Sequence, residues 1–169
     1  MQRNIKISTN IMILAIHAIT GAVLASESQN IWAAAVIGLV SHYFLDSIPH
    51  IEYKIQDIQH GNFRSAIKEF ITVFIDLATA LLVIIFFVYN FSYHQIILTL
   101  TGAFFAILPD GLVFWDYCIK NKGKNIFTKF LDEHNQIHAK IHSTVTNKFT
   151  IYASQLIILA ILILSVFKK

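Results

Sequence analysis

The chain contains few charged residues, one cysteine and two prolines, and each of these low counts limits the structures that the chain can form. Only 14% of its 169 residues are charged and 56% are hydrophobic, a balance outside the range of ordinary soluble domains. The single cysteine, Cys118, excludes an intrachain disulfide and gives no sign of an oxidising compartment. Each proline, Pro49 and Pro109, is expected to end a helix because proline removes a backbone donor. The composition therefore predicts a membrane protein of one domain.

Two functional signals are also missing. The net charge is +3 and the pI is near 9.0, but the lysines gather near the ends of apolar runs and form no dense basic stripe. This distribution argues against a nucleic-acid partner and in favour of membrane topology. No GxSxG-type nucleophile elbow occurs in the sequence, so a serine hydrolase is not supported.

Five apolar runs predict membrane-spanning helices, each of which needs about 20 mainly apolar residues. The runs cover residues 7–26, 28–45, 70–93, 94–115 and 149–167. We therefore expect an all-α, polytopic membrane bundle of about five transmembrane helices, forming a single domain over residues 1–169. The first run also resembles a secretory signal peptide, so cleavage of residues 1–25 is an alternative to their retention.

Lysine and arginine indicate the orientation of this bundle. The loops at 51–69 and 116–148 are basic, whereas those at 27–30 and 90–95 contain neither residue. Basic loops stay on the cytoplasmic side, so we expect a multi-pass protein with a cytoplasmic N-terminus and an amphipathic cytoplasmic helix within 116–148. Alignment on the two prolines suggests a half repeat of residues 11–53 and 70–117.

Titratable residues interrupt the apolar runs. An ionised aspartate at the centre of a membrane helix costs roughly 3 kcal/mol, so Asp46, Asp76 and Asp110 together cost up to roughly 9 kcal/mol unless they are paired or bind a cation. On the predicted topology these carboxylates lie toward the cytoplasmic ends of their helices, together with His42. His17 lies nearer the middle of the first run, within reach of the others.

His42 and Asp46 are four residues apart, which places both side chains on one face of a helix. Imidazole and carboxylate together suit zinc, manganese or iron. The alternative is a histidine–aspartate hydrogen bond that only holds helices together. His50 and Asp110 each follow a proline and are expected at helix ends, where Asp110 is alternatively a helix N-cap.

The segment LDEHNQIHAKIH places three histidines at intervals of four residues, on one face of the predicted amphipathic helix. We expect His134 and His138 to be metal ligands, because their loop returns to the side that carries the other candidates. A helix lying flat on the bilayer is the alternative, and it is the preferred interpretation for His142.

These segments resemble a known family. HAITGAVLA, SHYFLDSIPH, the helix of Asp76, LPD at 108–110 and FLDEHNQIH are similar to the bacterial membrane-bound, metal-dependent hydrolases of the YdjM-like group, which are distantly similar to zinc-dependent phospholipase C. The resemblance covers most of the chain. Gly111 departs from the fuller acidic signature that often follows Pro-Asp in the group. By position, the resemblance implies a bacterial cytoplasmic membrane protein with the metal ligands His17, His42, Asp46, His50, Asp76, Asp110, His134 and His138.

The expected function is metal-dependent hydrolysis at the cytoplasmic face. One or two ions of Zn²⁺ or another divalent metal would activate water, with Asp76 or Asp46 as the general base. Membrane lipids would be the partners, and the substrate would be a lipid-like phosphodiester or ester. The alternatives are a divalent-cation transporter or scaffold that uses the same residues, and a partner-binding protein that acts through loop 116–148.

Overall fold

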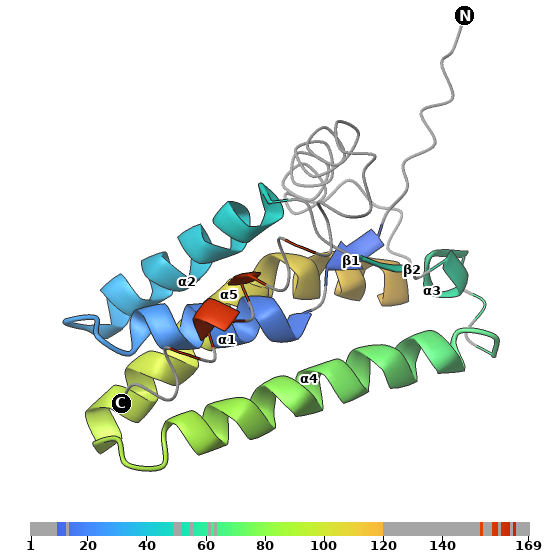
Figure 1. Ribbon diagram of the computed structural model, residues 1–169. Coiled ribbons are helices and arrows are strands. Elements are labelled where there is room, and N and C mark those ends of the chain that lie inside the picture. Colours follow the sequence, from blue (N-terminus) through green and yellow to red (C-terminus); the bar gives the residue numbers. More distant parts are fainter. Residues whose placement is uncertain are drawn as a thin grey trace, which may run out of the picture.

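The computed structural model describes residues 10–12, 14–48, 52–54, 56–60, 62 and 64–119, together with 153, 157, 158, 160–162 and 164 near the C-terminus. This part of the chain is mainly helical, as expected (Figure 1). Its elements are, in order, β1 (Asn10–Met12), α1 (Leu14–Ala25), α2 (Ile31–Asp46), β2 (Glu52–Lys54), α3 (Gln56–His60), α4 (Ile67–Phe87) and α5 (Tyr93–Ile119).

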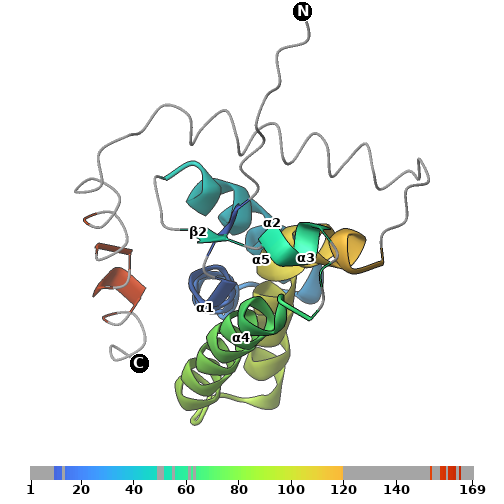
Figure 2. The ribbon, with the colours of Figure 1, turned by 90° about the vertical axis from the view of Figure 1, so that its right-hand side faces the viewer.

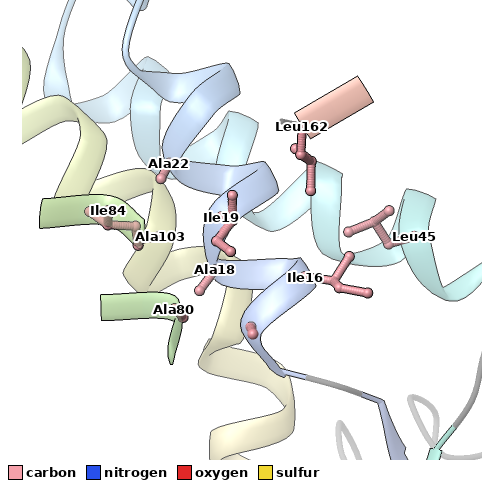
Figure 3. Packing of buried hydrophobic residues seen from close by; sticks show 10 residues of the cluster. Ile16, Ala18, Ile19, Ala22, Leu45, Ala80, Ile84, Ala103 and Leu162 are labelled. Carbon is pink, nitrogen blue, oxygen red and sulfur yellow. The ribbon is translucent and has the colours of Figure 1, made fainter. Parts of the chain in front are cut away.

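Helix α1 lies at the centre of the described helices, in contact with α2, α4 and α5 (Figure 2). Its sequence is mainly apolar, with His17 and Thr20 as polar exceptions, and nearly all of its residues are buried, as expected for a helix surrounded by other helices. One side carries Ile16 and Ile19, which share a cluster with Leu45 and Leu162, and another side carries small residues that face α4 and α5 (Figure 3). The first helix of the sequence is therefore the core of the fold.

A short turn joins α1 to α2. Asn30 begins α2 as its N-cap, because its side-chain oxygen accepts the backbone N–H of Ala33 at 3.0 Å. The two helices form an antiparallel hairpin, which brings the end of α2 beside the start of α1 (Figure 1).

Three glycines allow α1, α2 and α5 to touch backbone to backbone. A methyl group on Gly21 or on Gly38 would overlap the carbonyl oxygen of Gly102, and one on Gly102 would overlap Ala25 and the carbonyl oxygen of Gly21. This close approach is the small-residue packing that membrane helices use in place of hydrophobic burial. We call this contact of Gly21, Gly38 and Gly102 the glycine crossing. Because Gly21 and Gly38 each lie one turn from a histidine of the same helix, the crossing also sets the distance between His17 and His42.

The outer faces of the bundle are apolar. Among the described residues, two helices are long and apolar enough to cross a membrane, Ile67–Phe87 and Tyr93–Asp116, whereas α1 and α2 are shorter apolar helices. Large hydrophobic side chains point outward from several helices, including Val36 and Phe44 on α2 and Phe74 and Leu82 on α4. Of the five expected spans, two thus have the required length, and most of the fifth, 149–167, lies outside the described residues.

Two local expectations were wrong. Residues 10–12 fall in the first predicted span but form β1, which pairs antiparallel with β2 in the register Ile11 to Tyr53; α1 therefore begins only at Leu14. Pro109 does not end its helix, because α5 continues through it to Ile119. Asp110 therefore lies within α5, and the N-cap alternative for this residue is excluded.

Candidate metal centre

The end of α2 presents an imidazole and a carboxylate on one face. His42 Nε2 lies 3.2 Å from Asp46 Oδ2, as the four-residue spacing predicts for a helix. Both side chains are buried against α1 and α5. The rings of Tyr43 and His42 are nearly perpendicular, with an interplanar angle of 85° and centroids 5.2 Å apart.

The other nitrogen of His42 is held by the backbone of α5. His42 Nδ1 lies 2.9 Å from the carbonyl oxygen of Ala106, and because a carbonyl can only accept, Nδ1 must carry the proton of this hydrogen bond. Nε2 then faces the Asp46 carboxylate either with a second proton or across a cation. A histidine that donates Nδ1–H to a backbone carbonyl and presents Nε2 is the usual arrangement of a metal ligand.

The second imidazole comes from α1. His17 Nε2 lies 3.4 Å from Asp46 Oδ1, so the two oxygens of one carboxylate reach two histidines on different helices. The rings of His17 and His42 are stacked at a tilt of 36°, with centroids 4.5 Å apart. Asp46 therefore orients both imidazoles.

Asp110 on α5 completes the cluster. One ligand atom from each of His17, His42 and Asp110 can be chosen so that all three lie within 4.8 Å of one another. All three side chains, and that of Asp46, are buried. These three residues form a buried group that could hold a metal ion.

The donor chemistry fits a divalent cation. In a tetrahedral site, zinc bonds of about 2.0–2.2 Å to nitrogen or oxygen place two ligand atoms roughly 3.3–3.6 Å apart, so side-chain movements of roughly 1 Å would close the group around an ion. Two imidazoles with carboxylate oxygen are ligands that zinc, manganese and iron all accept. Asp46 and Asp110 both act electrostatically on His42, and one divalent charge would balance both carboxylates.

Four of the predicted site residues thus come together, namely His17, His42, Asp46 and Asp110. Asp76 makes a different contact, since its Oδ2 accepts the backbone N–H of Ala15 at 2.8 Å, and it is not a member of the group that could hold an ion. The predicted ligands His50, His134 and His138 lie outside the described residues.

Sequence reasoning missed the parts of the site that depend on packing between helices. The Ala106 carbonyl is a backbone acceptor, which no residue type reveals. The glycine crossing was also missed, although Gly21 with Ala25 and Gly102 with Ala106 each form a pair of small residues four apart, a recognisable signal of close helix contact.

Comparisons with protein-family models, curated proteins and solved structures found no match to this chain. The resemblance to the YdjM-like group therefore stays a prediction, and the geometry of the cluster carries the functional argument.

Proposed function

We propose that this protein is a membrane-embedded, metal-dependent hydrolase whose centre is held by His17, His42 and Asp110. The observation that carries the proposal is the convergence of two imidazoles and a carboxylate from three helices in a buried group. When bound there, a divalent cation would supply Lewis acidity and lower the pKa of water toward about 7. The resemblance to zinc-dependent hydrolases supports zinc as the ion.

Within the cluster, we assign Asp46 the role of general base and orienting carboxylate. Both of its oxygens lie beside the imidazoles, so it can accept a proton next to the ion and hold both ligands in place. We assign the substrate to the lipid-like phosphodiesters or esters, because such a molecule can present its polar group to the cluster without leaving the bilayer.

The position of the cluster supports a site that lies at one end of the helix bundle. The described ligands meet at one level, at the end of α2 and near the start of α1, on the same side as β2 and α3 of the basic loop 51–69 (Figure 1). We propose that this end is cytoplasmic, because basic loops are retained there. The central place of α1, which carries His17, supports retention of the first helix. We propose from the five apolar runs of the sequence that the chain crosses the membrane about five times.

The alternative of a divalent-cation transporter requires ligands staggered across the bilayer. On the far side of the cluster, Gly21, Gly38 and Gly102 bring three backbones so close that a methyl group would overlap. A hydrated ion does not fit between these helices at that level. The packing therefore supports an enzyme over a transporter that uses this interface.

The first test is metal content. Purified full-length protein should contain about one to two equivalents of zinc or a similar metal by elemental analysis, and the double variant His42→Ala with Asp46→Ala should contain none. The matched control removes one histidine and one aspartate outside the cluster, with His94→Ala and Asp116→Ala, and should keep the metal. Metal-free wild-type protein with unaltered folding would contradict the proposed centre.

The second test is activity. Wild-type protein in vesicles should release product from a phosphodiester or ester lipid when zinc is supplied, and the His42/Asp46 double variant should not. Metal-loaded protein that releases nothing from either lipid class but carries zinc into proteoliposomes would replace the hydrolase with the transporter.

A further inference from the structure

Helix α4 carries two carboxylates that accept backbone N–H groups at the starts of other helices. Glu69 uses Oε1 for Asp57 N–H at 3.1 Å and Oε2 for Ile58 N–H at 3.0 Å, in the first turn of α3. Asp76 uses Oδ2 for Ala15 N–H at 2.8 Å, in the first turn of α1. Glu69 and Asp76 are two turns apart on α4 and thus share one face.

The helix that Asp76 caps is the one that carries His17. The first N–H groups of any helix lack acceptors within the helix, and in apolar surroundings each needs an outside partner. A carboxylate is a suitable partner because the start of a helix carries partial positive charge. Ala15 precedes His17 by two residues, so this hydrogen bond fixes the height and rotation of the turn that presents the imidazole.

Helix α3, which Glu69 caps, follows a short strand just as α1 does. β1 leads into α1 and β2 leads into α3, and the two strands pair with each other. The two carboxylates of α4 therefore hold both helix starts that follow this ribbon. Of these two helices, α1 supplies a residue, His17, to the group that could hold an ion and α3 supplies none; that group, sought among the described residues, does not include Asp76.

We propose that Asp76 is a positioning residue for His17, acting through the Ala15 N–H, and not the metal ligand or general base that the sequence predicts. This inference rests on the proposed metal centre. It requires a hydrogen-bond acceptor at position 76 but no negative charge. A ligand or a base requires the carboxylate itself.

Two substitutions separate these roles. Asp76→Asn keeps an oxygen acceptor of the same shape, and we expect its zinc affinity in detergent to stay within about threefold of wild type. Asp76→Leu removes the acceptor, and we expect a loss of about 10- to 100-fold, as for other residues that orient a ligand. The visible spectrum of the Co²⁺-loaded protein should be unchanged in Asp76→Asn, because the ligand set is unchanged.

Glu69→Leu is the matched control. It removes the same kind of hydrogen bond from the same face of α4, but the helix that loses its cap is α3. Zinc affinity should therefore stay within about threefold of wild type. An equal loss in Glu69→Leu and Asp76→Leu would show a general effect of helix packing and would overturn the proposed link to His17.

Hydrogen exchange gives a readout that needs no metal. The peptide that contains Ala15 should exchange faster in Asp76→Leu and at the wild-type rate in Asp76→Asn. If wild-type protein binds no zinc, the proposed metal centre fails, and this exchange comparison alone decides whether Asp76 holds α1; unchanged protection in Asp76→Leu would overturn the inference. If wild-type protein binds zinc and Asp76→Asn does not, Asp76 is a ligand and only this inference fails.

Discussion

The His42 imidazole uses its two nitrogens for two different purposes. Nδ1 is held by a backbone carbonyl on a neighbouring helix, and Nε2 faces a carboxylate on its own helix. The second contact follows from the spacing of His42 and Asp46 and was predicted from the sequence. The first contact, and that between His17 and Asp46, cross between helices, so local periodicity could not specify them.

Asp110 and Asp46 place two buried carboxylates beside the same histidine, and this arrangement predicts opposite effects on binding and stability. Asp110→Asn should lower zinc affinity at least about tenfold, by weakening a ligand. In metal-free protein the same change removes one of two like charges, and it should raise the midpoint of thermal unfolding by about 2–4 °C, equivalent to about 1 kcal/mol for a chain of this size. Zinc titration and thermal unfolding of the metal-free protein measure the two effects.

Asp116→Asn provides the comparison on the same helix. It removes the same charge from a residue outside the group that could hold an ion, so both zinc affinity and the unfolding midpoint should stay near wild type. A stability loss in metal-free Asp110→Asn would contradict the proposed repulsion between the two carboxylates, and an unchanged zinc affinity would contradict the role of Asp110 as a ligand.

Helix α5 shows where local rules hold and where they fail. Its apolar run was recognised from the sequence, but its continuation through Pro109 was not. Proline deprives the Phe105 carbonyl of a helical donor, yet membrane helices tolerate this where neighbouring helices hold the backbone. Here the His42 side chain bonds to the next carbonyl, that of Ala106. This bond does not replace the donor that Phe105 loses, but it ties α5 to α2 beside the proline, and α5 also packs along α1. Such tertiary contacts lie outside the local rule that proline ends a helix, and the rule gave the wrong boundary.

Two glycine-to-alanine variants of α5 test the close contact of Gly102 with its neighbouring helices. Gly102→Ala would place a methyl group against the Gly21 backbone, and we expect a loss of about 1–3 kcal/mol in unfolding free energy together with weaker zinc binding as α5 moves away. Gly111→Ala adds the same methyl group where nothing lies within 4 Å, and it should stabilise the helix by up to about 1 kcal/mol. Chemical unfolding and zinc titration of both variants measure the difference. Equal effects in the two variants would refute the role of close backbone contact.

The bundle as a whole has aromatic residues near both ends. Trp32 and Tyr93 are exposed at the end that carries the α1–α2 turn, and Trp115 is exposed on α5 beyond Asp110. From Tyr93 to Trp115 the helix rises roughly 33 Å, close to the roughly 30 Å thickness of a hydrocarbon core. Aromatic side chains favour the two membrane interfaces. On the proposed membrane topology, the distribution predicts a level in the bilayer for every residue of α5, including Asp110.

Tryptophan fluorescence with brominated lipids tests this assignment. A variant with Trp115 as its only tryptophan (Trp32→Phe) should be quenched most by lipids brominated near the headgroup. A variant with the additional changes Trp115→Phe and Phe104→Trp places the only tryptophan midway along the exposed face, and it should be quenched most by lipids brominated near the chain ends. Strong quenching of the second variant by aqueous iodide would mean that this face meets water, contrary to the membrane assignment.

On the proposed topology, this depth also predicts which bond of a phospholipid lies nearest the site. Asp110 precedes Trp115 by a rise of roughly 7–8 Å, so an interfacial Trp115 places the cluster below the headgroups, nearer the level of acyl esters than of phosphates. Zinc-loaded protein in vesicles should therefore release fatty acid faster than phosphorylated headgroup from a phospholipid. Mass spectrometry of both products from one vesicle preparation measures the ratio. A preference for the headgroup product would require the substrate to sink into the bundle or the bilayer to thin at this end, and the depth from Trp115 fluorescence distinguishes these two outcomes.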